Sequence, residues 1–177
     1  MSLTDSLMML AAIHFVATVS PGPEFVLISK ETLSRGRRAG FICLAGTLAG
    51  LLIHISYSAL GLAAVIAKTP QLLILIQLLG GAYLIWLGIG GLRAKPLGDT
   101  EICHRIEEKS ALQTFRQGFL CDLLNPKATV YYISLFTFVL SPDVSAFHIS
   151  VYSACFMLIH FAWFTLVVLG LSNPQIN

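Results

Sequence analysis

Long apolar segments separated by short polar ones dominate the chain and predict membrane-spanning helices. Residues 39–67, 69–92 and 144–177 contain no Asp, Glu, Lys or Arg. Each run can cross the hydrocarbon core of a bilayer, which takes about 20 helical residues. Two further segments, 7–27 and 119–140, are apolar except where prolines and charged residues interrupt them. We therefore expect an all-α polytopic bundle with five transmembrane helices, two of them broken.

The composition supports a membrane protein over a soluble one. Hydrophobic residues make up 56% of the chain and charged residues 11%, whereas soluble domains carry about 25% charged residues. Unbroken apolar runs lack the alternation of a transmembrane β-barrel. The first basic residue is Lys30, so the N-terminal segment lacks the basic start of a signal peptide and is expected to remain as the first helix.

The basic residues predict how the chain lies in the membrane. Nine of the eleven lie in or beside the connections at residues 30–38 and 93–116, and basic connections face the cytoplasm. We expect a bacterial inner-membrane protein with its N-terminus in the periplasm and its end, after the fifth helix, in the cytoplasm. The net charge of +2 follows this distribution and does not suggest nucleic-acid binding.

A polar linker at residues 94–114 divides this single transmembrane domain, 1–177, into the halves 1–93 and 115–177. A Pro-Gly-Pro-Glu motif in the first half resembles Asn-Pro-Lys in the second, and Leu-Ile-His occurs once in each. A repeat of three helices enters the membrane in opposite senses, as in many secondary transporters. The second half is expected to be incomplete, because no sixth apolar segment follows the fifth.

The first proline motif predicts a helix break. Pro21 and Pro23 remove helix donors, and Gly22 lowers helix propensity. Broken backbone at membrane depth lines cavities and, in transporters, binds substrate carboxylates and ions; a purely structural kink is the alternative. Glu24 follows, and three interpretations stay open: pairing with Lys127, proton exchange, or a position at the cytoplasmic interface.

The second motif predicts a matching break at Asn125, Pro126 and Lys127. Asn125 can cap a helix or coordinate a ligand through its amide. Asp122 lies one turn toward the cytoplasm. Asp122 and Lys127 either lie inside the membrane or mark its cytoplasmic border, with the lysine reaching outward along its stem.

His54 and His160 lie deep in the second and fifth predicted helices. Each is a candidate for a proton relay, with Asp122, or for an interhelical contact. An intramembrane enzyme using both histidines and Glu24 is the competing hypothesis. The sequence has no nucleophile motif and nothing like HExxH, so we expect neither an enzyme nor a metal or other cofactor. The four scattered cysteines are interpreted as packing residues.

Several motifs together resemble the LysE/RhtB family of amino-acid exporters, closest to its threonine and homoserine efflux branch. They are Ser-Pro-Gly-Pro-Glu at 20–24, Ser-Arg-Gly-Arg-Arg-Ala-Gly at 34–40, Gly-Gly-Ala-Tyr-Leu-Ile-Trp-Leu-Gly at 80–88, Gly-Phe at 118–119 and Leu-Asn-Pro-Lys at 124–127. The resemblance implies proton-driven export of small neutral amino acids such as threonine, homoserine or their derivatives. It assigns the binding of substrate or ion to the two proline motifs.

The chain departs from the family pattern in its acidic residues, Glu24 and Asp122, and in the absence of a sixth helix. Family members often carry Asn or Asp after Pro-Gly-Pro and a neutral residue near position 122, which affects the substrate expected. The alternative function is therefore a non-transporting membrane fragment that needs a partner. The expected partners are an amino acid, protons, the lipid bilayer and, for a completed bundle, a second copy in a homo-oligomer.

Overall fold

The computed structural model describes residues 3–68, 109–139 and 144–172, together with Leu78, Ala82 and Ile85. The helices in chain order are α1 (Leu3–Val19), α2 (Pro23–Arg35), α3 (Arg37–Lys68), α5 (Ala111–Leu123), α6 (Pro126–Val139) and α7 (Ala146–Leu171). The expected all-α fold is confirmed. The predicted third span, 69–92, lies outside the described residues except for those three single positions.

Two of the described helices, α3 over residues 37–60 and α7, are long and apolar enough to cross a membrane. The pair α1 and α2 makes a third candidate if its two parts, bent by 57°, are taken as one span. The predicted segment 119–140 is represented by two shorter helices, α5 and α6. The described residues thus cover four of the five predicted spans, two as single helices and two as broken pairs.

Both predicted breaks are confirmed, and in each a proline begins a helix. Pro23 is the first residue of α2 and Pro126 the first of α6, a position where the missing N–H costs nothing because it would have no intrahelical partner. The Asn125 side-chain oxygen accepts the Lys127 backbone N–H at 3.0 Å. Asn125 therefore caps α6, whereas Gly22, which precedes α2, offers no side-chain cap.

Two helices begin or end differently from the sequence expectation. The first broken helix continues to Arg35, which pairs with Glu31 one turn earlier at 2.7 Å, and Glu31 is in turn buried against Lys109. Helix α5 begins at Ala111, inside the predicted linker, because Ser110 and Gln113 form a capping box. Between α2 and α3 the chain turns at Gly36, whose φ of 79° is a left-handed conformation that favours glycine.

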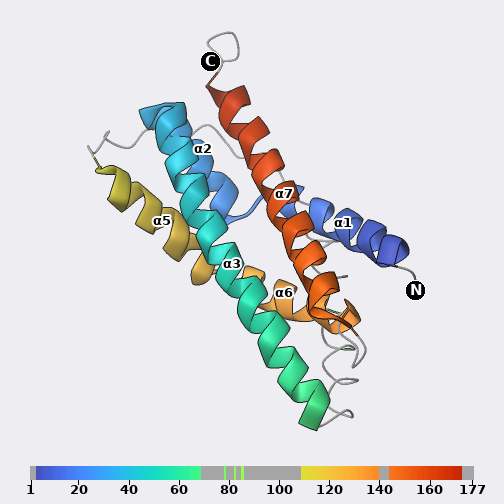
Figure 1. Cartoon of the computed structure of the whole chain (residues 1–177). Helices are drawn as coiled ribbons and strands as arrows, with labels where there is room; N and C mark the ends of the chain where they lie inside the picture. Colours follow the sequence, from blue (N-terminus) through green and yellow to red (C-terminus); the bar gives the residue numbers. More distant parts are fainter. Residues whose placement is uncertain are drawn as a thin grey trace.

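Helix α3 is central among the described elements. It contacts α2, α5, α6 and α7, while α7 contacts α1 and α2 as well as α3. Figure 1 shows α3 and α7 running in opposite directions, with the broken helices beside them. Each long helix therefore packs against the broken helix of the other half of the chain.

Helices α3 and α5 approach to backbone contact. A Cβ atom added at Gly46 would overlap the carbonyl oxygen of Phe115, and one added at Gly118 would overlap that of Cys43. Small residues at such crossings are how membrane helices come close enough to gain packing energy. Gly46 and Gly50 form a Gly-x-x-x-Gly sequence, and both lie against α5, so this spacing serves the packing of α3 on α5.

The buried side chains form two clusters. The first joins α1, α3, α6 and α7 through Leu10, Leu51, Ile55, Ala59, Ala128, Tyr131, Tyr132, Leu135, Phe136, Tyr152 and Phe156. The second joins α2, α3 and α7 through Ile28, Cys43, Leu44, Phe164 and Val168. A cavity borders both clusters, and both helix breaks face it.

Candidate functional site

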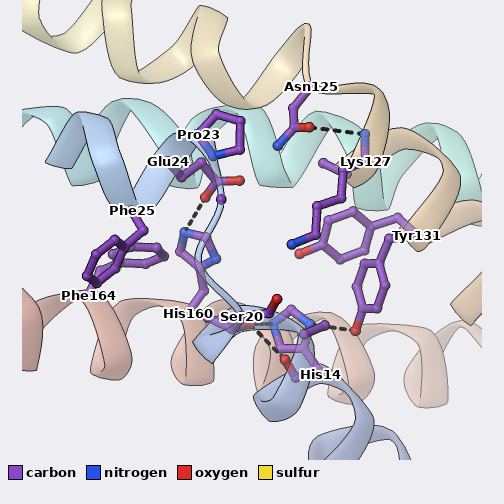
Figure 2. A pocket seen from close by; sticks show the side chains of 15 residues that line it. His14, Ser20, Pro23, Glu24, Phe25, Asn125, Lys127, Tyr131, His160 and Phe164 are labelled. Atoms are coloured by element: carbon purple, nitrogen blue, oxygen red, sulfur yellow. Dashed lines mark hydrogen bonds and ion pairs between the residues drawn. The ribbon is translucent and has the colours of Figure 1, made fainter. Parts of the chain in front are cut away.

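The cavity has a volume of about 60 Å³ and is bounded by α1, α2, α6, α7 and the two breaks. At about 30 Å³ per water molecule it has room for two waters. Figure 2 shows the side chains that line it. They are His14, Ala17, Thr18, Ser20, Gly22, Pro23, Glu24, Phe25, Asn125, Lys127, Ala128, Tyr131, Tyr132, His160 and Phe164.

Six of the ten sequence-predicted residues line this cavity, and four do not. Those inside are Gly22, Pro23, Glu24, Asn125, Lys127 and His160. Pro21 and Pro126 belong to the breaks, and His54 and Asp122 lie in the adjoining layer, where α3 meets the end of α5. The two proline motifs, separated by about a hundred residues in sequence, thus meet at one place.

Glu24 is held at the first break by its helix and by a histidine of the other half. It lies in the first turn of α2, where the helix dipole favours negative charge. One carboxylate oxygen, Oε2, lies 3.3 Å from His160 Nε2 on α7. Its side chain is 15% exposed, so the acid is largely enclosed rather than placed at a solvated border.

Lys127 faces Glu24 from the opposite side of the cavity (Figure 2). A Cβ added at Gly22 would lie 3.6 Å from Lys127 Nζ, so the ammonium group reaches across to the first break. Lys127 is the second residue of α6, where the dipole disfavours a cation. Attraction from the Glu24 carboxylate offsets this cost.

Asp122 and His54 form a second acid–imidazole contact, between α5 and α3. His54 Nε2 lies 2.9 Å from the Asp122 carbonyl oxygen and 3.6 Å from its carboxylate Oδ2. Because a carbonyl can only accept, Nε2 carries the proton, and Nδ1 accepts from the Tyr57 hydroxyl at 2.5 Å. Both side chains are buried, and His54 makes an interhelical contact.

The two acid–imidazole contacts are connected. The carboxyl groups of Glu24 and Asp122 are close enough to interact electrostatically, and the Asn125 side chain also acts on Glu24. An array of ionisable side chains therefore runs from His160 on α7 through Glu24 and Asp122 to His54 on α3. Among the described residues, no group of three or more His, Cys, Asp or Glu side chains is arranged to hold a metal.

Sequence reasoning missed His14 and Tyr131, which line the cavity beside the first break. The Tyr131 hydroxyl lies 3.0 Å from His14 Nδ1, and His14 Nε2 lies 3.2 Å from the Phe156 carbonyl oxygen. The signal was helical spacing: His14 and Thr18 are one turn apart just before the first break, and Tyr131 follows Lys127 by one turn. Residues on one helix face beside a break share its cavity.

Comparison with known proteins gives a consistent picture. Residues 15–176 match the family of LysE type translocators. The threonine efflux protein of Escherichia coli K12 is 31% identical over 169 residues, covering 94% of this chain and 82% of the relative. That of Salmonella typhi is 32% identical with the same coverage. An uncharacterized membrane protein of Vibrio cholerae is 33% identical over 128 residues, 72% of this chain and 61% of the relative. No solved structure matches the chain.

Proposed function

Because the chain belongs to the family of LysE type translocators, we propose that it exports small neutral amino acids, such as threonine, homoserine or their derivatives, across the bacterial inner membrane. The relatives named above support amino-acid export as the class of activity. The observation that carries the choice of substrate is the cavity with Glu24 on one side and Lys127 on the other.

A neutral amino acid matches this arrangement of charge. At neutral pH it carries one ammonium and one carboxylate group and no net charge. Lys127 binds the carboxylate, and Glu24 binds the ammonium, so the substrate takes the place of the direct attraction between the two side chains. The cavity of about 60 Å³ is smaller than a whole amino acid, so the helices that bound it must move apart to admit one. Ser20 and Thr18 in its wall offer hydrogen bonds to a substrate hydroxyl.

Transport proceeds by alternating access between two inverted halves, residues 1–93 and 115–177. The packing supports this, because α3 lies against α5 and α6 while α7 lies against α1 and α2. The long helix of each half thus contacts the broken helix of the other half, which is the relation that an inverted repeat requires. The basic ends of α2 and of the linker favour a cytoplasmic position for the start of α3 and a periplasmic one for the N-terminus.

The proton gradient drives export through the array from His160 to His54. Ionisable residues inside a membrane are costly, about 2.5 to 3.5 kcal/mol each on insertion scales, and typically mark ion or proton paths. Glu24 belongs both to the substrate cavity and to this array. A proton on Glu24 and a substrate ammonium therefore compete for one carboxylate, which couples the two fluxes.

The test is efflux of threonine from cells that express the chain and are preloaded with a threonine dipeptide. Lys127→Met is expected to lower the efflux rate by about tenfold or more, the effect of one lost charge-assisted hydrogen bond of about 1.5 to 3 kcal/mol. Arg116→Ala, an exposed residue of α5 outside the cavity, is the control and leaves efflux unchanged. Unchanged efflux in Lys127→Met at equal expression contradicts the site.

A second arm of the same assay tests the driving force. A protonophore, which collapses both the pH gradient and the membrane potential, is expected to stop efflux against a threonine gradient. Efflux against the gradient that persists after the protonophore contradicts proton coupling while leaving amino-acid export intact.

A further inference from the structure

A second cavity, of about 290 Å³, lies at the end of the molecule where α2 ends and α3 and α5 begin. It is lined by Arg35, Arg38 and Lys109 together with Ala39, Ile42 and Ala111. Figure 1 shows the α2–α3 connection and the start of α5 at the same end of the molecule. The volume is close to the lower limit of small-molecule sites, about 300 Å³. The substrate cavity uses none of these residues.

A buried carboxylate holds two of these cations in place. Glu31, 1% exposed, contacts Arg35 Nη1 at 2.7 Å and Lys109 Nζ at 3.2 Å through its two oxygens. Arg35 also donates to the Thr114 hydroxyl at 2.7 Å and to the Lys109 carbonyl oxygen. Arg35 and Lys109 therefore have fixed positions, and ordering them for a ligand costs little further entropy.

The electrostatics of the cavity favour an anion. Three cationic side chains line it, and Glu31 contacts two of them. Among the described residues that meet at this cavity, the count is thus three positive charges to one negative charge. The cavity also adjoins the first turn of α3, which carries no acidic residue and follows Gly36, a residue without a side chain to cap it. The positive end of the α3 dipole adds to the field of the three cations.

The cavity wall is apolar as well as cationic. Ala39, Ile42 and Ala111 complete the lining, and Ile42 lies on α3 within the stretch that is apolar enough to cross a membrane. A free inorganic phosphate has no apolar part for such a wall. A phospholipid presents its phosphate at the membrane surface and its glycerol and acyl carbons just below. The phosphate would thus meet the cations, and the carbons would meet Ile42.

We propose that this cavity binds the phosphate of an anionic phospholipid, with Arg38 as the ligand-contacting cation and Arg35 and Lys109 as the anchored ones. Basic pockets between membrane helices on the cytoplasmic side are suited to such headgroups. The site joins α2, α3 and α5, so an occupied site ties the two halves of the chain together at this end. It does not depend on the substrate or on the driving force proposed above.

The test measures binding of phosphatidylglycerol to the purified full chain by native mass spectrometry, with phosphatidylcholine as the lipid control. Arg38→Ala is expected to weaken phosphatidylglycerol binding by about tenfold, equivalent to about 1.4 kcal/mol. Arg37→Ala is the matched control, because it removes the same charge from the neighbouring exposed residue, which does not line the cavity. General attraction to an anionic surface, about 1 kcal/mol per basic residue, would weaken both variants equally, and that result overturns the site.

A second pair of variants changes the cavity without changing charge. Ala111→Phe narrows it from an exposed position, whereas Leu112→Phe, also exposed but outside the lining, does not. We expect Ala111→Phe to lose phosphatidylglycerol binding and Leu112→Phe to keep it. Equal binding by these two variants, no preference for phosphatidylglycerol over phosphatidylcholine, or displacement of bound lipid by millimolar inorganic phosphate each overturns the proposal.

Discussion

The two helix breaks are built differently, although both face one cavity. At the first, Glu24 lies at the positive end of α2, where the helix dipole favours its charge. At the second, Lys127 lies at the positive end of α6 and Asp122 in the last turn of α5, so both charges oppose their helix dipoles. The charges of the second break therefore depend more strongly on partners elsewhere than the charge of the first break does.

The breaks also differ in how they are fixed. The second is held at backbone level, because His54 bonds the Asp122 carbonyl oxygen and Gly50 lies against the Asp122 side chain. The first bends by 57° and is tied to α7 by the side-chain contact between Glu24 and His160. We infer that the second break is the fixed part of the site and the first the part that adapts.

The largest effect is expected where α5 packs on α3. Gly118→Leu places carbon atoms inside the backbone of α3, which cannot shift as a side chain could. We therefore expect a cost above the range of about 1 to 3 kcal/mol that overpacking has where neighbours relax. We expect loss of most of the folded, monodisperse protein in size-exclusion chromatography. The control is Gly170→Leu on α7, where nothing lies within 4 Å of an added Cβ. An equal loss of folded protein in this control would show that the loss in Gly118→Leu does not come from the contact between α5 and α3.

The charges across the cavity provide the next test. Lys127→Met removes the cation that attracts the largely enclosed Glu24 carboxylate, and we expect it to cost less than breaking a buried ion pair in direct contact, which costs about 3 to 5 kcal/mol. Glu24→Gln alone is expected to cost less, and the double variant to recover part of the stability lost in Lys127→Met. Thermal unfolding of the four proteins measures this cycle, and additive effects of the two changes would show that the side chains are not coupled.

The two buried histidines should differ in what they affect. His54→Ala removes a hydrogen bond to the backbone of the second break and should cost about 1 to 3 kcal/mol of stability, with a smaller effect on export from the protein that still folds. His160→Ala should do the reverse, lowering threonine efflux more than thermal stability. If both variants shift stability and efflux in the same proportion, the distinction between a fixed and an adaptable break fails.

The smallest effects concern two glycines. Gly36→Ala forces a left-handed conformation on a residue with a Cβ and should cost about 1 kcal/mol. Gly22→Ala keeps an extended backbone, φ −144°, and its Cβ meets Lys127 Nζ at an ordinary contact distance, so stability should change by less than about 0.5 kcal/mol. Chemical unfolding separates the two, and a larger cost at Gly22 would show that the first break is not adaptable.

The sequence predicted the breaks because proline acts locally. Pro23 and Pro126 begin helices whatever surrounds them, and the run of apolar residues in α3 and α7 predicts spans in the same direct way. It did not predict that α2 extends to Arg35, because that extension depends on Glu31 being buried against Lys109, a contact between residues 78 positions apart.

Part of the candidate site was predicted from the sequence, because charged residues and prolines can be recognised locally. Glu24 and Lys127 were paired from the repeat, and both line the cavity. The contact of Glu24 with His160 and the role of His14 depend on how α7 and α1 cross, and short sequence motifs carry no information about crossing geometry. Charged residues and prolines can be recognised in the sequence, whereas the residues that they contact are determined by tertiary packing.

The central claim is that Lys127 binds the substrate carboxylate, and titration of the purified chain with threonine and with threonine amide tests it most directly. The amide keeps the ammonium group but lacks the carboxylate. The unaltered chain should bind threonine about tenfold or more tightly than the amide, a difference of about 1.4 kcal/mol, and Lys127→Met should bind the two equally. A Lys127→Met chain that still prefers threonine by the full factor would contradict the account.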